Sequence, residues 1–124
     1  MGQEPCPLAS MVVASINPHI AALAGRRVFV TGHTGFKGSW LVHWLKVLGC
    51  TVTGYALAPE TTPNLFDLSD VESQLKGHHV GDIRDGDALA AAMTAARPEI
   101  VLHLAAQAIV RRSYTDPVMT WDIN

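Results

Sequence analysis

The stretch that decides the fold is VFVTGHTGFKG, residues 28–38. Its first four residues are β-branched or aromatic, which is typical of a short buried strand. Gly32, Gly35 and Gly38 then follow at intervals of three. Beyond them, residues 38–48 carry apolar side chains at helical spacing, and Gly49 ends the run. The sequence therefore predicts a strand, a glycine loop and a helix in direct succession.

A glycine loop between a strand and a helix is typical of sites that bind the pyrophosphate of a dinucleotide. Gly32 permits the tight turn, Gly35 leaves room for a pyrophosphate against the main chain, and Gly38 lets the helix pack close to the sheet. Free amides at the helix start would hold the phosphates. A glycine-rich turn without a ligand is the alternative. An ATPase-type phosphate loop does not fit, because Lys37 is followed by Gly38 rather than by Ser or Thr.

Strands and helices alternate along the rest of the chain. The expected strands are residues 28–31, 51–57, 79–83 and 100–104, and the expected helices are residues 38–48, 65–75, 87–96 and 117–124. Asp85 and Asp116 are expected to cap the last two helices, and Trp40 and Trp44 to lie in the core. This alternation predicts an α/β fold, a Rossmann-type doubly wound parallel sheet. Such sheets normally have about six strands, so we expect one truncated after about four.

The length and composition of the chain indicate one folded domain preceded by a short arm. Its 124 residues are 48% hydrophobic and 16% charged, which supports a folded core. Residues 1–25 contain three prolines and no sustained period, so we expect a loose N-terminal arm with one helical turn near residues 19–23. Residues 26–124 would form an incomplete NAD(P)-binding Rossmann domain.

Charge and cysteine usage exclude several classes of partner. A net charge of −2 argues against nucleic acid or an anionic membrane surface as the main partner. No run of about 18 apolar residues is present, so no membrane span is expected. Cys6 and Cys50 lie far apart and form no CxxC motif. We therefore expect a reduced, cytoplasmic protein without a zinc site.

The choice of dinucleotide depends on the residues after the second strand. An acid near the strand end would hold the adenosine ribose of NAD, but Ala58 occupies the expected place and Glu60 comes two residues later. Two interpretations of Glu60 stay open, a ribose ligand or a solvated loop acid. No Lys or Arg lies between residues 47 and 75 to bind a 2′-phosphate. Lys37 of the glycine loop could reach one, so NADP is not excluded. We expect NAD, with NADP less favoured.

The ends of the third and fourth strands complete the candidate site. Asp82 would accept a hydrogen bond from adenine while Ile83 covers its ring, the alternative being an ordinary turn. Residues 104–107 are small enough to let the cofactor lie across the strand end, the alternative being tight packing. The small-residue segment comprises Leu104, Ala105, Ala106 and Gln107.

Several arginines and histidines of the chain could either bind a ligand or serve the fold. Arg111 and Arg112 would either meet a substrate phosphate or form a solvated pair. We expect His33 to pack against or hydrogen-bond the turn. His78 and His79 are not expected to bind a metal together, because adjacent strand residues point to opposite faces.

These residues resemble a known family. Residues 31–41, TGHTGFKGSWL, are similar to the opening of the extended short-chain dehydrogenase/reductases, the NAD-dependent epimerase/dehydratase family, and most closely to CDP-glucose 4,6-dehydratases. Residues 54–57, 81–85, 103–107 and 110–117 continue this resemblance in the same order. It covers residues 17–124, which is the amino-terminal part of that family only.

The resemblance implies a function. NAD would accept a hydride from C4 of the sugar, water would be lost across C5 and C6, and the hydride would return to C6 to give CDP-4-keto-6-deoxyglucose, which makes the family lyases. The resemblance also implies that the partner is a nucleotide sugar and, by analogy, that the protein forms a homodimer. It further implies that Asn124 helps to order the active site. The residues it implies along the pyrophosphate are Gly32, Thr34, Gly35, Phe36 and Lys37, with Asp82 and Ile83 at adenine and residues 104–107 at the ribose and nicotinamide.

One departure from the family decides the expected activity. Its catalysts include a tyrosine with a lysine four residues later. Here Tyr55 is followed four residues later by Pro59, and Tyr114 by Val118. We therefore expect no catalytic residue in this chain and no turnover by this fragment. The alternatives are another nucleotide-sugar epimerase or dehydratase, a non-catalytic dinucleotide-binding module, and a truncation product without a function.

Overall fold

The computed structural model describes residues 18–124 and contains one parallel sheet in that region. Its strands lie in the order β3-β2-β1-β4. Their bounds are β1 (Arg27–Thr31), β2 (Thr51–Ala56), β3 (Gly77–Val80) and β4 (Ile100–His103). The chain steps outward from β1 to β2 to β3 and then crosses to the other side of β1 to form β4. The strand order therefore reverses between β1 and β4, at the centre of the sheet.

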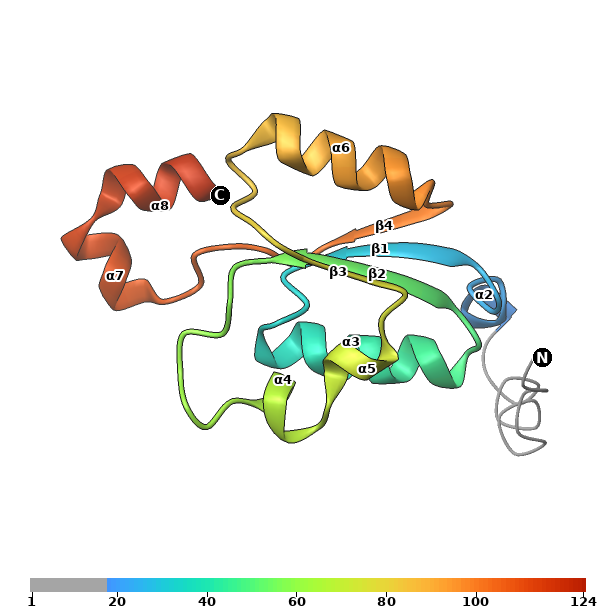
Figure 1. Cartoon of the computed structure of the whole chain (residues 1–124). Coiled ribbons are helices and arrows are strands. Elements are labelled where there is room, and N and C mark those ends of the chain that lie inside the picture. Colours follow the sequence, from blue (N-terminus) through green and yellow to red (C-terminus); the bar gives the residue numbers. More distant parts are fainter. Residues whose placement is uncertain (1–17) are drawn as a thin grey trace.

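Helices cover both faces of the sheet, which confirms the predicted doubly wound α/β fold. Figure 1 shows α3, α4 and α5 below the sheet, α6 above it, and α7 and α8 beyond the carboxyl ends of the strands. The helices are α2 (Pro18–Ala21), α3 (Phe36–Val47), α4 (Leu65–Leu68), α5 (Val71–Gln74), α6 (Gly86–Ala96), α7 (Val110–Thr115) and α8 (Pro117–Ile123). None of these helices is long and apolar enough to cross a membrane.

Alternation along β1 divides the core into two layers. Val28 and Val30 face α3, where they pack with Val42 and Leu45. Phe29 points to the other face and packs with residues that include Ala92 of α6. Burial on both faces explains why β1 is a continuous apolar run rather than an alternating one.

The first long helix is rotated relative to the prediction. Trp40 and Trp44 were expected in the core, but their exposed fractions are 58% and 38%. The buried face of α3 instead follows Gly38, Val42 and Leu45. Because Gly38 lies against the glycine loop, the residues four and seven positions later turn inward with it. The two tryptophans consequently lie toward solvent.

Other boundaries differ locally from the prediction. Residues 65–75 form two short helices rather than one, because Asp70 adopts a left-handed conformation (φ 50°) between them. Strand β3 begins two residues earlier than expected, and helix α7 was not predicted. The caps were predicted correctly, since Asp85 accepts a hydrogen bond from the Ala88 amide and Asp116 from the Met119 amide.

The expected N-terminal arm falls mostly on residues 1–17, outside the described residues. In residues 18–25, Ile20 and Leu23 pack against the core. The Leu23 carbonyl accepts a hydrogen bond from the free, buried thiol of Cys50.

Candidate functional site

The ends of all four strands meet at a cleft of about 590 Å³. It lies at the carboxyl edge of the sheet, where open α/β sheets bind their ligands. Ten of the twelve predicted site residues line it: Gly32, Thr34, Gly35, Phe36, Asp82, Ile83, Leu104, Ala105, Ala106 and Gln107. The other two do not, because the Lys37 side chain is exposed outside the lining and Gly38 is buried beneath the loop.

Gly32 lets the ends of β1 and β4 approach each other. Its φ is +78°, and a Cβ there would lie 2.7 Å from the amide nitrogen of Ala105 and 2.8 Å from the carbonyl carbon of Leu104. Any larger residue would have to push the β4 end away. The glycine therefore sets the width of the cleft floor at the switch point.

Gly38 serves packing rather than the cleft. A Cβ at this position would overlap the Gly32 carbonyl oxygen and lie 2.7 Å from the Cα of His33. The helix start thus rests directly on the preceding loop. Ser39 strengthens this contact, because its buried hydroxyl donates to the His33 carbonyl at 3.1 Å.

The start of α3 offers free hydrogen-bond donors. Gly35 is the N-cap and provides no capping side chain. The amides of residues 36–38 have no hydrogen-bond acceptor within residues 18–124. The first turn of a helix presents such amides together with the positive end of the helix dipole. A helix start facing a cleft in this way is suited to an anion, and phosphate is the usual one.

Thr31 joins β1 to β4 at the edge of the cleft. Its hydroxyl accepts from the amides of Leu104 and Ala105, both at 3.2 Å. The same hydroxyl forms a hydrogen bond with Nδ1 of His103, 2.6 Å away. Neither Thr31 nor His103 was predicted as a site residue. The signal for Thr31 was a polar residue at the end of an apolar strand.

His33 lies under the glycine loop and is fully buried. Its Nε2 is 2.8 Å from Nδ1 of His78, and its ring meets the edge of Phe66. A Cβ on Gly54 would overlap this ring. Burial, and secondarily the charge of His78, lower the pKa of His33 from 6.5 to about 4. His33 is therefore neutral near pH 7, and its ring packs against His78 and Phe66.

The two neighbouring histidines of β3 point to opposite faces, as predicted. His78 faces His33 and Phe66, whereas His79 stacks against Tyr55 on the other side of the sheet. Within residues 18–124, no group of three or more His, Cys, Asp or Glu side chains is arranged to hold a metal ion.

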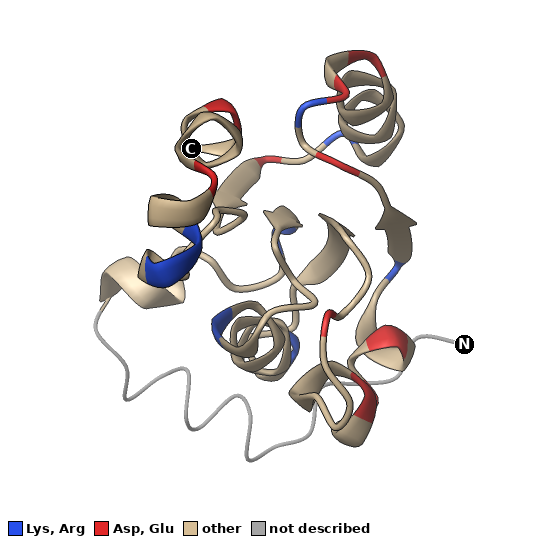
Figure 2. Ribbon diagram, turned by 90° about the vertical axis from the view of Figure 1, so that its left-hand side faces the viewer, with Lys and Arg blue, Asp and Glu red and all other residues tan. Residues whose placement is uncertain are grey.

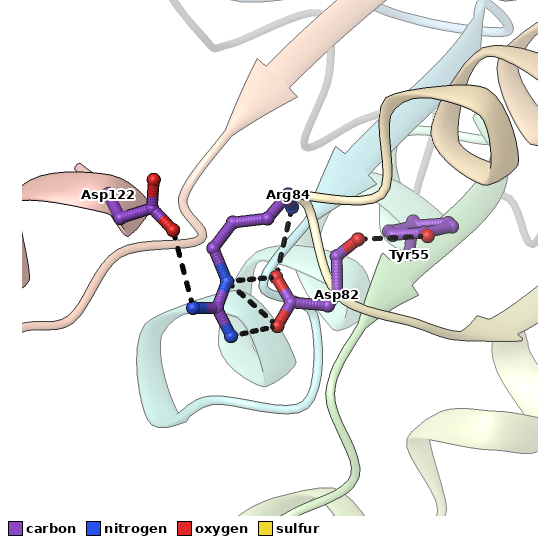
Figure 3. Close-up of polar contacts among 4 residues, drawn as sticks. All are labelled: Tyr55, Asp82, Arg84 and Asp122. Atoms are coloured by element: carbon purple, nitrogen blue, oxygen red, sulfur yellow. Dashed lines mark hydrogen bonds and ion pairs between the residues drawn. The ribbon is translucent and has the colours of Figure 1, made fainter. Parts of the chain in front are cut away.

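The predicted adenine side carries a network of charges (Figure 3). Arg84 contacts the Asp82 carboxylate through Nη2 at 2.6 Å and through Nε at 3.1 Å. Hydrogen bonds from Arg84 hold the pKa of Asp82 below its usual range. Arg84 also reaches Asp122 of α8 at 3.5 Å, and the Tyr55 hydroxyl donates to the Asp82 carbonyl. The Asp82 carboxylate is thus partly occupied by a residue of its own loop.

A second ion pair joins the loop after β2 to α7. Nη1 and Nη2 of Arg112 donate to the two carboxylate oxygens of Glu60 at 3.0 and 3.2 Å. Both residues line the cleft. Both side chains are also partly exposed, so both interpretations of each residue stay open. Figure 2 views the molecule from the side of α7 and α8 and shows both acidic and basic residues spread around the sheet.

Gln107 ties α8 to the end of β4. Its amide donates to Oδ1 of Asn124 at 2.8 Å, and Nδ2 of Asn124 donates back to its carbonyl at 3.2 Å. Its side chain donates to the hydroxyl of Thr120. Gln107 therefore fixes the position of α8 and also lines the cleft.

Neither tyrosine lines the cleft. Tyr55 is buried in the sheet, and the exposed fraction of Tyr114 on α7 is 84%. The described residues therefore place no tyrosine within the cleft to act as a base.

A four-stranded parallel sheet with flanking helices, a glycine loop after β1 and a cleft at its switch point defines a Rossmann-like domain. Residues 29–124 match the family model described as GDP-mannose 4,6 dehydratase, so the chain belongs to that family. The chain is 50% identical over 100 residues to the CDP-glucose 4,6-dehydratase of Salmonella typhimurium, covering 81% of this chain and 28% of that protein. The predicted resemblance is thereby confirmed.

Solved structures give the same family setting. The UDP-glucose-4-epimerase of Stenotrophomonas maltophila, with bound NAD and formylated UDP-arabinopyranose, is 27% identical with a TM-score of 0.68, covering 80% of this chain and 30% of that one. The UDP-glucose 4-epimerase of Thermus thermophilus in complex with NAD is 32% identical with a TM-score of 0.67, covering 78% and 29%. The chain spans less than a third of the length of these relatives.

Proposed function

We propose that this chain forms the NAD-binding part of a nucleotide-sugar 4,6-dehydratase that converts CDP-glucose to CDP-4-keto-6-deoxyglucose. The observation that carries the proposal is the uncapped start of α3, where Gly35 and Phe36 line a cleft at the β1/β4 switch point and the first amides of the helix are free. The 50% identity to a CDP-glucose 4,6-dehydratase supports the choice of sugar nucleotide.

The cleft residues suit a dinucleotide whose adenine lies near the end of β3 and whose nicotinamide lies near the end of β4. The free amide of Phe36 and the side-chain-free Gly35, which both line the cleft, receive the pyrophosphate. Asp82 and Ile83 take the adenine side, and residues 104–107 take the ribose and nicotinamide side. When bound, NAD supplies the acceptor and later the donor of the hydride. Lys37 lies outside the lining, so its share in the pyrophosphate site is electrostatic at most.

Two other functions have specific support. The solved epimerases that resemble the chain make a nucleotide-sugar epimerase the neighbouring possibility. The lack of a tyrosine in the cleft, within the part of the chain that the structure describes, favours a dinucleotide-binding module without turnover for this chain taken alone. Binding of CDP-, dTDP-, UDP- and GDP-glucose in the presence of NAD separates the substrate classes. A cytoplasmic location and a homodimer stay predictions.

Gly35→Asp tests NAD binding directly. A Cβ at Gly35 has only the Gly32 carbonyl oxygen nearby, at 3.4 Å, so the variant should fold. Aspartate is a favoured N-cap, which should keep or raise the melting temperature. Its carboxylate would occupy the anion site, and we expect NAD affinity measured by calorimetry to fall more than about tenfold.

Gly86→Asp is the matched control, because it adds the same side chain at the start of α6, outside the cleft and with open space around it. It should leave NAD affinity unchanged. Equal affinities for Gly35→Asp and the unmodified chain would overturn the proposed site.

A further inference from the structure

Helices α7 and α8 stand apart from both layers of the core. Neither helix contains a buried residue, and neither layer includes one of their side chains. The two helices pack chiefly on each other, beyond the carboxyl ends of the strands (Figure 1). Yet Arg112 of α7 and both Met119 and Ile123 of α8 line the cleft. Segments with few buried apolar contacts open at a low cost in free energy, so this part of the cleft wall is suited to movement.

The segment between β4 and α7 is bonded to the sheet at its start and to the helices after that. The hydroxyl of Thr31 in β1 accepts hydrogen bonds from the two amides of residues 104–105. Beyond them, the hydrogen bonds of Gln107 and Ile109 all stay within residues 106–124, which we call the α7–α8 unit. The unit is therefore held together internally, and its connection to the sheet can pivot just after the Thr31 contacts.

Two ion pairs join the α7–α8 unit to the other half of the sheet. Glu60, in the loop after β2, accepts hydrogen bonds from Nη1 and Nη2 of Arg112 at 3.0 and 3.2 Å. Arg84, in the loop after β3, reaches Asp122 at 3.5 Å (Figure 3). No other ion pair or side-chain hydrogen bond joins the unit to residues 20–105. The position of the unit over the cleft thus depends on two pairs of charged side chains.

Both pairs are of a kind that opens readily. Their four side chains are between 41% and 65% exposed. An exposed pair rarely changes an equilibrium by more than about fivefold. Because β2 and β4 flank β1 in the sheet, the Glu60–Arg112 pair spans the end of β1, where the glycine loop lies. Breaking the pairs would therefore widen the entrance to the cleft.

We propose that the α7–α8 unit is a lid on the cleft, which pivots at residues 106–109 and is held closed by the Glu60–Arg112 and Arg84–Asp122 pairs. The inference rests on the proposed function, since the ligand that the lid admits and retains is the dinucleotide. Opening lets the ligand enter and leave, and each pair favours the closed position. Because neither pair needs the ligand in order to form, the lid slows binding and release by similar factors and leaves the affinity nearly unchanged.

The test is stopped-flow fluorescence of NADH binding, with release followed by displacement with excess NAD. In Arg112→Gln and in Asp122→Asn we expect the association and dissociation rates both to rise about threefold. Arg111→Gln is the matched control, because it removes the same charge from an exposed position of α7 outside the cleft lining. It should leave both rates unchanged. Exchanging the partners, in Glu60→Arg with Arg112→Glu, should restore the pair and both rates.

The signs of these effects separate a lid from a simple change of charge. The dinucleotide is anionic, so removing the Asp122 carboxylate would by charge alone slow its dissociation, whereas the lid predicts faster dissociation. Removing the Arg112 guanidinium would by charge alone slow association, whereas the lid predicts faster association. Hydrogen exchange of the chain without ligand gives a second readout. Either substitution should speed amide exchange in α7 and α8 together, because they move as one unit, and should leave exchange in α6 unchanged.

The outcomes distinguish the lid from the proposed function. If NADH binds but Arg112→Gln and Asp122→Asn do not raise both rates, the lid is refuted and the proposed function stands. The lid is likewise refuted if amide exchange in α7 and α8 stays at the rate of the unmodified chain, or if Arg111→Gln acts like Arg112→Gln. If the unmodified chain binds no NADH, the proposed function fails, and the lid fails with it because it has no ligand to admit.

Discussion

His33 stands within the glycine loop, yet it faces the protein interior. Its Nε2 contacts His78, and its Nδ1 has no hydrogen-bond partner within residues 18–124. A protonated ring there would be a buried charge beside a second imidazole, which is unfavourable. The loop that carries the candidate anion site is therefore supported from below by a histidine that must stay neutral.

This environment predicts a pH-dependent stability. The pKa of His33 is 6.5 when exposed and about 4 in the folded chain, so the unfolded chain binds a proton that the folded chain does not. Stability should fall as the pH drops from about 6.5 to about 4 and level off below. Each tenfold difference in proton affinity is worth about 1.4 kcal/mol, which gives a loss of up to about 3 kcal/mol. Urea unfolding over this pH range measures it.

The control for this prediction is His33→Gln, which removes the titrating ring. His78, which contacts His33, and His79, which lies on the other face of the sheet, both stay in the variant. Its unfolding free energy should vary less between these pH values than that of the unmodified chain. An unchanged pH dependence in His33→Gln would assign the effect to other groups.

At the scale of elements, helix α6 shows how local signals set boundaries. Asp85 adopts a non-helical conformation and accepts the Ala88 amide at 3.0 Å. At the other end, Arg97 takes a left-handed conformation (φ 44°). The cap was predictable because an aspartate three residues before its donor is a local pattern. The α6 helix thereby starts at the end of the segment that carries Asp82.

Asp85→Ala should lower the free energy of unfolding by about 1 kcal/mol, because the Ala88 amide loses its acceptor. Asp85→Asn should restore most of it, since the amide oxygen can cap. Asp87→Ala removes another exposed acid of the first turn that makes no such bond, and it should cost less. Chemical denaturation of the three variants checks the order, which a larger loss in Asp87→Ala would contradict.

The rotation of α3 was not predictable from its own residues. Trp40, Leu41, Trp44 and Leu45 form an apolar stripe, and hydrophobicity alone favours burying its largest members. The close contact of Gly38 with the Gly32 carbonyl turns the helix so that Val42 and Leu45 face the sheet. Packing against a neighbouring segment therefore decided which apolar face was buried.

At the scale of the whole molecule, the cleft is assembled from the ends of four strands. Segments after β1, β2, β3 and β4 all line it, and α7 and α8 close its far side. The ion pair of Arg84 with Asp122 (Figure 3) holds α8 in place. The hydrogen bonds between Gln107 and Asn124 do the same. The cleft thus exists only when the complete four-stranded sheet has formed.

This assembly predicts binding without turnover. No tyrosine of the described chain lines the cleft, and no tyrosine in the sequence has a lysine four residues later. Incubation of the purified chain with NAD and CDP-glucose should yield no 4-keto sugar, while calorimetry shows NAD binding. A full-length relative such as the Salmonella typhimurium enzyme is the positive control. Formation of a 4-keto sugar by this chain alone would contradict the prediction.

Residues 28–38 by themselves determined the strand, the glycine loop and the helix start, because their signals lie within about ten residues. The same is true of the caps at Asp85 and Asp116. Only the tertiary structure decided the rotation of α3, the Glu60–Arg112 pair and the contact of Thr31 with His103. The reason is that these contacts join residues far apart in sequence, and they exist only because the chain crosses over to place β4 beside β1.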